Sequence, residues 1–223
     1  MSSSIKKMAE KVTLLSFWPS MFCVFALEEK GLSYEYREDL PNKTPLLTEM
    51  NSIHKKIPIL IHNGKPICES LIIVEYIDDV WSDRAQLLPS DPYEKAQARF
   101  WADFVDKKVY GAGGKITWHR YKHEAAEGKK ELIENLKVLE GVLGDKSYFG
   151  GETFGYLDIA LLGFYMWFPA YETFGSFSIE AECPKLIAWG RRCSQRESVS
   201  KCLAEPNKMV DVVVRFRRMF GLK

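Results

Sequence analysis

The chain has 223 residues, of which 46% are hydrophobic and 27% are charged. This is the composition of a globular protein with a real core, and it argues against disorder. Its 31 basic and 30 acidic residues leave a formal net charge of +1, so electrostatics gives no reason to expect nucleic acid or a membrane surface as a partner.

The N-terminus and the cysteines indicate where the chain works. Residues 1–11 contain no apolar signal-peptide core, and no segment reaches roughly 18 uninterrupted apolar residues. We therefore expect a cytoplasmic protein. Its five cysteines are scattered without metal-ligand or C-x-x-C spacing, so we expect reduced thiols and no metal site. They are Cys23, Cys68, Cys183, Cys193 and Cys202.

Strand and helix patterns alternate over residues 12–81. Strands are predicted at 12–17, 32–37, 57–61 and 66–68, and helices at 23–30, about 44–51 and 71–81. The order β-α-β-α-β-β-α predicts a four-stranded mixed sheet with helices on both faces.

The last two strands form a predicted hairpin. Asn63 and Gly64 can take the two positive φ angles of a type I′ turn. Pro58 enters the buried strand without an N–H to donate, so another group must meet that edge. After the hairpin, Ser70 is predicted to cap the next helix, whose first N–H groups would form an anion site.

Everything after the polar linker 82–90 reads as helical. Asp91, Pro92 and Glu94 give a strong start signal for a helix that could reach about Trp118, with a kink expected at Gly111–Gly114. An amphipathic helix is predicted at 124–143, ending at Gly144. A fully apolar helix at 156–168 should be central, with Asp158 accepting from its first turn. Two further helices are predicted at 184–192 and 206–219. The expected division is therefore an N-terminal extension (1–11), an α/β domain (12–81), a linker (82–90) and a helical domain (91–223).

Several motifs resemble one known family. They are F-W-P-S at 17–20, N-K-T-P at 42–45, M-N-S-I-H-K-K-I-P at 50–58, H-N-G-K-P-I-C-E-S at 62–70 and G-Y-L-D-I-A-L at 155–161. Together they are similar to the tau class of plant glutathione transferases over nearly the whole chain. The resemblance implies a thioredoxin-like domain joined to an all-helical domain, and a homodimer.

The resemblance also implies how glutathione is held. Ile57 would pair its backbone with the cysteinyl residue of glutathione, beside a cis Pro58, so that the tripeptide acts as an added strand. Glu69 and Ser70 would bind the γ-glutamyl end. Lys43 and Lys56 would meet the glycine carboxylate.

Ser20 matches the catalytic serine of the family. Its hydroxyl would donate to the glutathione sulfur and favour the thiolate. Lowering a thiol pKa of roughly 8.5 by about two units needs about 2.7 kcal/mol. One hydrogen bond to an anion supplies roughly 1.5 to 3 kcal/mol, so the scheme works without a general base.

The thiolate would attack a hydrophobic electrophile between the domains. By position, the residues expected to line that pocket are Phe17, Phe22, Tyr110, Trp167, Phe216 and Phe220. This chain has Gly114 and Thr117 where the class often has arginine and tryptophan, which predicts a roomier pocket.

One departure from the class pattern concerns the catalytic serine. After Ser20 the chain is three residues shorter than the pattern, lacks its arginine, and has Cys23 in place of a glycine. Removing three residues rotates a helix by about 60° and shortens it by about 4.5 Å. Either the first helix is shortened and repacked, or Ser20 is displaced.

Three functions follow from these observations. The first is conjugation of glutathione to hydrophobic electrophiles, with possible reduction of organic hydroperoxides. The second is a catalytically weakened carrier that still binds glutathione and apolar ligands. The third, a thiol transferase acting through Cys23, is less favoured because the family with that chemistry uses the first cysteine of its motif, which is absent here.

Overall fold

The computed structural model describes residues 11–38, 44–203 and 205–222. Its N-terminal part holds a four-stranded sheet of order β2-β1-β3-β4. The strands are β1 (Val12–Ser16), β2 (Glu35–Glu38), β3 (Ile59–His62) and β4 (Lys65–Cys68). Strand β1 pairs in parallel with β2 and antiparallel with β3, and β3 pairs antiparallel with β4. The predicted mixed sheet is confirmed.

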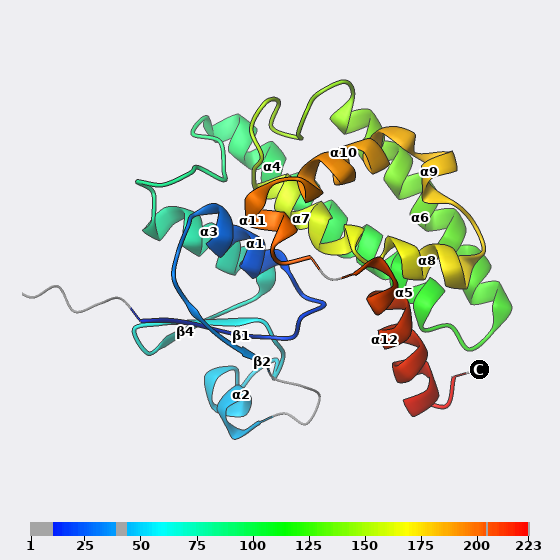
Figure 1. Ribbon diagram of the computed structural model, residues 1–223, viewed down its shortest axis with the longest axis horizontal. Coiled ribbons are helices and arrows are strands. Elements are labelled where there is room, and N and C mark those ends of the chain that lie inside the picture. Colours follow the sequence, from blue (N-terminus) through cyan, green and yellow to red (C-terminus); the bar gives the residue numbers. More distant parts are fainter. Residues whose placement is uncertain (1–10, 39–43, 204, 223) are drawn as a thin grey trace, which may run out of the picture.

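Alternate residues of the central strands pack against helices on opposite faces of the sheet (Figure 1). Leu14 and Leu60 are buried with α1 (Phe22–Glu29) and α3 (Ser70–Val80). Leu15 and Ile59 are buried on the other face with Leu47 of α2 (Pro45–Met50). This alternation follows from the period of two along a strand.

The hairpin forms as predicted, but the start of α3 differs. Asn63 and Gly64 have φ angles of 49° and 80°, as a type I′ turn requires. The prediction that Ser70 caps α3 is wrong, because Ser70 is already the first helical residue and Glu69 holds the capping position without a side-chain bond. Glu69 has a φ of 72°, so the chain turns from strand into helix at that single residue.

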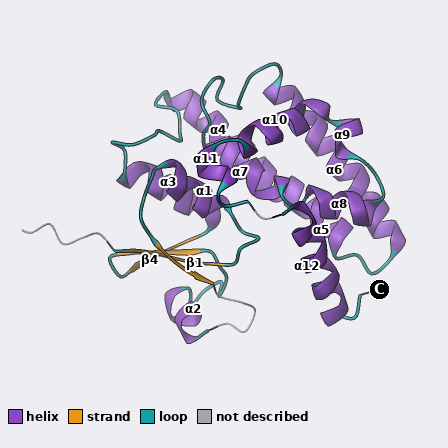
Figure 2. Cartoon of the chain, in the orientation of Figure 1, coloured by secondary structure: helices purple, strands orange, loops and turns teal. Residues whose placement is uncertain are grey.

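The remainder of the chain is helical (Figure 2). The helices are α4 (Pro92–Phe104), a π-helical segment η1 (Val105–Val109), α5 (Tyr110–Thr117), α6 (Lys122–Leu143), α7 (Tyr156–Tyr165), α8 (Phe168–Gly175), α9 (Ile179–Glu182), α10 (Pro184–Ser194), α11 (Glu197–Ser200) and α12 (Pro206–Met219). As predicted, Asp91 caps α4 through the N–H groups of Tyr93 and Glu94. Within the described ranges, no helix combines the length and the apolarity that a membrane crossing needs.

The irregularity in the long α4–α5 helix is not where the glycines predicted it. It is the π-helical turn η1, whereas Gly111 to Gly114 lie inside α5. Gly113 is required for packing, because a Cβ there would lie 2.4 Å from Cζ of Tyr171 in α8. The predicted helix at 156–168 is also divided, since α7 ends at Tyr165 and the new helix α8 begins at Phe168, with Pro169 in its first turn.

A buried ion pair joins the α/β part to the linker. Lys30, at the end of α1, places Nζ 2.7 Å from Oδ1 of Asp78 in α3, and its side chain is fully buried. The same Asp78 carboxylate accepts from the N–H groups of Leu87 and Leu88, each at 2.9 Å. A buried pair with this many hydrogen bonds fixes the orientation of the linker relative to α3.

Candidate active site

The register of the sheet brings three separate segments to the same end of the sheet. Leu15 of β1 pairs with Ile59 of β3, and Ile59 pairs with Cys68 of β4. The residues just beyond these pairs are therefore neighbours at the same end of the sheet. They are the turn after β1, the Ile57–Pro58 bond before β3, and Glu69 with Ser70 after β4.

Ser20 lies in a tight turn after β1. Its N–H donates to the Phe17 carbonyl oxygen at 2.8 Å, and the Ser16 hydroxyl donates to the Ser20 carbonyl oxygen at 3.3 Å. The helical part also holds this turn, because Trp167 Nε1 donates to the Pro19 carbonyl oxygen at 3.3 Å. The turn is thus fixed from both halves of the chain, and Ser20 itself is partly exposed.

The segment before β3 is shaped by Asn51, a buried residue that the motifs contain but that was not singled out. Its side chain donates to the Lys56 carbonyl oxygen at 3.0 Å and accepts from His54 N–H at 3.1 Å. The Ile57–Pro58 bond is cis, as the resemblance implied. Lys56 is exposed beside this bond, whereas Lys43 lies outside the described residues.

Carboxylates gather around the start of α3. Glu69 is exposed and lies 4.0 Å from His54 Nε2, which brings that histidine to the site although no role was predicted for it. Asp106, on η1, is a second carboxylate on which the charge of Glu69 acts. Its pKa is raised by burial first, and then by the negative charges of Asp103 and Glu69. Such a cluster favours a cationic group such as an ammonium. No signal in the sequence pointed to Asp106. The structure provides one, because π-helical turns often occur at functional sites and Asp106 lies in one.

Cys23 is a buried thiol behind the site. It belongs to helix α1, in which every residue from Phe22 to Leu27 is buried. Its Sγ lies 3.9 Å from the Ser70 carbonyl oxygen, so α1 packs directly on the first turn of α3. Burial raises the Cys23 pKa far above the usual thiol value. A thiol in that state is a poor nucleophile, which disfavours the thiol transferase hypothesis.

Four aromatic residues meet beside the Ser20 turn. Phe17 makes an edge contact with Phe216 of α12 at 6.3 Å between ring centroids. Phe216 stacks on Phe220 at 6.0 Å, and Trp118 makes edge contacts with both at 6.4 Å. We call these four residues the aromatic cluster. It joins three of the predicted pocket residues, Phe17, Phe216 and Phe220, to Trp118.

The C-terminal helix is held against the cluster by a buried charge. Arg217 has only 5% of its surface exposed, and its Nη1 donates to the Thr117 carbonyl oxygen at 2.7 Å. Its bond to the end of α5 keeps Phe216 in contact with Phe17.

The other three predicted pocket residues lie differently. Phe22 is buried, contacts Phe164 at 5.2 Å, and covers Gly163, so it offers little surface to a ligand. Tyr110 is exposed and contacts the same Phe164 at 6.0 Å. Trp167 stacks on Tyr171 at 6.5 Å, in addition to its bond to the Ser20 turn.

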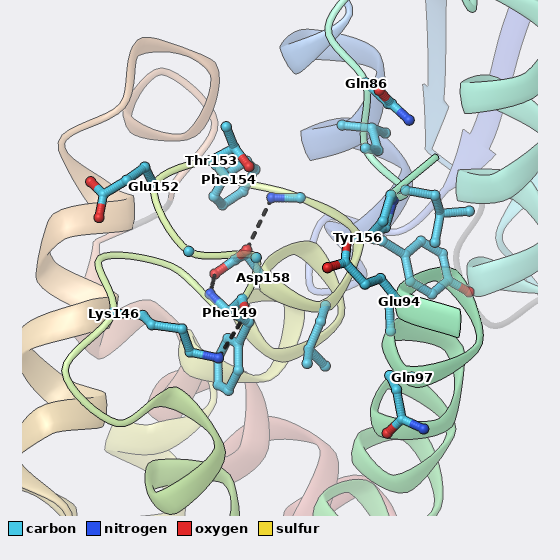
Figure 3. Close-up of a pocket in the computed structure, with 18 of the residues that line it drawn as sticks. Gln86, Glu94, Gln97, Lys146, Phe149, Glu152, Thr153, Phe154, Tyr156 and Asp158 are labelled. Atoms are coloured by element: carbon cyan, nitrogen blue, oxygen red, sulfur yellow. Dashed lines mark hydrogen bonds between the residues drawn. The ribbon is translucent and has the colours of Figure 1, made fainter. Parts of the chain in front are cut away.

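A cavity of about 880 Å³ lies elsewhere, between the linker, the start of α4 and the loop before α7 (Figure 3). It contains none of the predicted site residues. Its inner wall includes Asp158, whose carboxylate accepts from the N–H groups of Phe149 and Gly155 and from Trp189 Nε1, at 2.8 to 3.0 Å. Asp158 thus accepts at the start of its helix, from the capping residue Gly155, where the prediction was an N–H group of the first turn.

Two family models cover most of the chain. Residues 10–79 match "Glutathione S-transferase, N-terminal domain" and residues 93–197 match "Glutathione S-transferase, C-terminal domain". Among curated proteins, the chain is 62% identical to glutathione S-transferase U25 of Arabidopsis thaliana, with 97% of this chain and 99% of that protein covered. It is also 62% identical to the probable glutathione S-transferase parC of Nicotiana tabacum, with 96% and 99% covered.

Solved structures agree. The structure of rice GST1 (OsGSTU1) in complex with glutathione superposes with a TM-score of 0.90 at 43% identity, over 95% of this chain and 98% of that one. A tau-class glutathione S-transferase from mango gives a TM-score of 0.86 at 38% identity, over 92% and 98%. The chain belongs to the glutathione S-transferase family of enzymes. Within that family its relatives place it in the tau class, as its motifs predicted.

Proposed function

We propose that this enzyme conjugates the thiol of glutathione to hydrophobic electrophiles, with Ser20 as the group that activates the thiol. The observation that carries the proposal is the convergence of the Ser20 turn, the Ile57–Pro58 bond and the Glu69–Ser70 pair at one edge of the sheet. An extended tripeptide can pair with the backbone of Ile57 there and act as a further strand.

The charges at this edge suit the two ends of glutathione. The first N–H groups of α3 favour the γ-glutamyl carboxylate, while Glu69 and Asp106 favour the neighbouring ammonium. Lys56 is free to approach the glycine carboxylate at the other end, and Lys43 is proposed for the same role. The orientation of the tripeptide then directs its central cysteine toward the turn that carries Ser20.

Ser20 would act as a hydrogen-bond donor and not as a base. A hydroxyl aimed at sulfur stabilises the thiolate more than the thiol and lowers its pKa. The thiolate then attacks the electrophile, which the aromatic cluster and Tyr110 would hold by contact with its apolar surface. Phe22 and Trp167 would support this pocket from behind.

The test is a pair of variants, Ser20→Ala and Ser20→Thr, assayed for conjugation of a chloronitrobenzene and for glutathione binding by calorimetry. Loss of a hydrogen bond to an anion predicts a rate about 10- to 100-fold lower in Ser20→Ala, with glutathione affinity close to that of the unmodified enzyme. Ser20→Thr keeps a hydroxyl and should recover part of the rate. Unchanged turnover in Ser20→Ala would contradict the mechanism.

A glutathione-binding carrier of apolar ligands is the second candidate. It is favoured by the departure from the class pattern after Ser20, which is three residues shorter and lacks the arginine, and which leaves an α1 of eight residues. Retention of the unmodified enzyme on immobilised glutathione without measurable turnover would favour this function. Peroxidase activity toward organic hydroperoxides is a further proposal, tested with cumene hydroperoxide under the same conditions.

The proposal extends to the organisation of the enzyme. We propose residues 12–81 as the glutathione-binding domain, 82–90 as the linker and 91–223 as the domain that binds the electrophile. We also propose a cytoplasmic homodimer. Light scattering of the purified protein would test the dimer, and a monomeric mass would contradict it.

A further inference from the structure

Tyr156 reaches from the helical part of the chain onto the first turn of α3. It is the first residue of α7, and only 3% of its surface is exposed. Its hydroxyl lies 3.1 Å from Oε1 of Glu75 and 3.4 Å from the carbonyl oxygen of Leu71. Leu71 directly follows Ser70, so this hydroxyl contacts the helix start to which the γ-glutamyl end of glutathione is assigned.

The base of Tyr156 is held rigidly. Its N–H donates to the Leu87 carbonyl oxygen at 2.8 Å, and a Cβ on the preceding Gly155 would lie 2.7 Å from that same oxygen. Asp158 binds the loop before α7, as described above. Figure 3 shows Tyr156 on the α4 side of the cavity, pointing away from Asp158. The side chain therefore extends from a fixed backbone.

The Glu75 carboxylate, which accepts from the Tyr156 hydroxyl, is also held in place. Glu75 is bound by Arg99 of α4 through both carboxylate oxygens, with Nε at 3.0 Å from Oε1 and 3.1 Å from Oε2. Burial, and then the charge of Glu75, raise the pKa of the Tyr156 hydroxyl, which keeps its proton for donation. Three helices, α3, α4 and α7, thus meet at one hydrogen-bonded group behind Ser70.

We propose that Tyr156 is a positioning residue, whose hydroxyl sets the first turn of α3 so that its N–H groups meet the γ-glutamyl carboxylate of glutathione. The inference rests on the proposed glutathione site. It adds that Tyr156 of the helical domain, a residue with no proposed contact to glutathione itself, controls the affinity for the γ-glutamyl end.

The test compares Tyr156→Phe with the unmodified enzyme by calorimetric titration with glutathione and by steady-state kinetics. Because only a hydroxyl is removed, we expect the Kd and KM for glutathione to rise about three- to tenfold. The kcat at saturating glutathione and the KM for the electrophile should stay within about twofold. If the role of Tyr156 were purely structural, Tyr156→Phe would lower the Tm without raising the glutathione KM selectively over kcat.

Two controls separate the hydroxyl from its surroundings. Tyr148→Phe removes another tyrosine hydroxyl of the same part of the chain, one that accepts from Arg196 at 3.5 Å, and should leave the glutathione Kd unchanged. Glu75→Gln keeps an oxygen acceptor for Tyr156 but weakens the ion pair with Arg99, and should change the Kd by less than about twofold.

The outcomes are distinguishable. If the unmodified enzyme does not bind glutathione, the proposed function fails. If the enzyme binds glutathione and Tyr156→Phe binds it equally well, only the role of Tyr156 is overturned. A loss of affinity in Glu75→Gln as large as that in Tyr156→Phe would assign the effect to the Arg99 ion pair and would also overturn the proposal.

Discussion

Leu15 and Ile59 face each other in the antiparallel register of β1 and β3. Because Ile59 also faces Cys68 of β4, this single pairing aligns the ends of three strands. The turn that carries Ser20 then follows one strand, the cis Pro58 precedes the next, and Glu69 follows the third. A slip of one residue would move the side chains of β3 to the opposite faces of the sheet, so the core and the site depend on the same register.

The first prediction concerns Cys23. Since burial keeps its thiol protonated, Cys23→Ser should retain conjugation activity within about threefold. Mass spectrometry of the folded enzyme after exposure to oxidised glutathione should find any slow adduct on the partly exposed Cys68 or Cys202. An adduct on Cys23 itself that disappears in Cys23→Ser would restore the thiol transferase hypothesis.

The second prediction concerns the aromatic cluster. Phe216 contacts Phe17, Trp118 and Phe220, and aromatic pairs contribute about 0.5 to 1.5 kcal/mol each. Phe216→Ala should therefore raise the KM for an aromatic electrophile about three- to tenfold, with the KM for glutathione unchanged. Phe220→Ala is the graded comparison, because Phe220 is 59% exposed, and its effect should be smaller. Equal electrophile KM values in all three proteins would place the pocket elsewhere.

The third prediction uses the pH dependence of stability. Burial raises the pKa of Asp158 from 3.8 to about 6, against the lowering effect of the hydrogen bonds that its carboxylate accepts. A folded-state pKa above the unfolded value means that protonation favours the folded state, so the contribution is full below about pH 4 and is lost as pH rises through 6.

Asp158→Asn cannot titrate and isolates this contribution. The stability difference between the enzyme and the variant, measured by urea unfolding, should be larger at pH 5 than at pH 7, by on the order of 1 to 2 kcal/mol. A larger difference at pH 7 would mean that the hydrogen bonds from Phe149, Gly155 and Trp189 outweigh burial and lower the pKa.

The fourth prediction tests the packing between α1 and α7. A Cβ at Gly163 would lie 2.6 Å from the Phe22 ring, so Gly163→Ala should displace Phe22 and cost about 1 to 3 kcal/mol of stability. Gly141, also inside a helix, has nothing within 4 Å of such a Cβ, and Gly141→Ala should stabilise by about 0.5 to 1 kcal/mol. The Tm values should move in opposite directions. An unchanged or higher Tm in Gly163→Ala would mean that Phe22 moves aside without cost, and would contradict the prediction.

The local signals in the sequence predicted the sheet and most helices. Asn63-Gly64 defined the hairpin turn, and Asp91 with Pro92 defined the start of α4, because these residues act through bonds to their immediate neighbours. The same reasoning failed for Gly111 to Gly114. Glycine lowers helix propensity, but here Tyr171 and α6 pack against the small residues of α5, and tertiary packing outweighs propensity.

The site was predicted in part for the same reason. Ile57 belongs to one motif and Glu69 and Ser70 to the next, and the hairpin joins the two, so their proximity could be inferred from chain order. Asp106 and Tyr156 belong to η1 and α7, and Tyr156 reaches α3 through the docking of α7 on the linker. Neither the π-helical turn nor the docking of α7 leaves a local pattern in the sequence, so neither could be predicted from it.

Glutathione is proposed to lie along the Ile57–Pro58 segment with its sulfur at Ser20. A crystal structure of the enzyme with glutathione bound tests this placement. We expect hydrogen bonds between the Ile57 backbone and the cysteinyl residue of glutathione, with the Ser20 hydroxyl as the nearest donor to the sulfur. A sulfur directed at Cys23, or out of reach of the Ser20 hydroxyl, would contradict it.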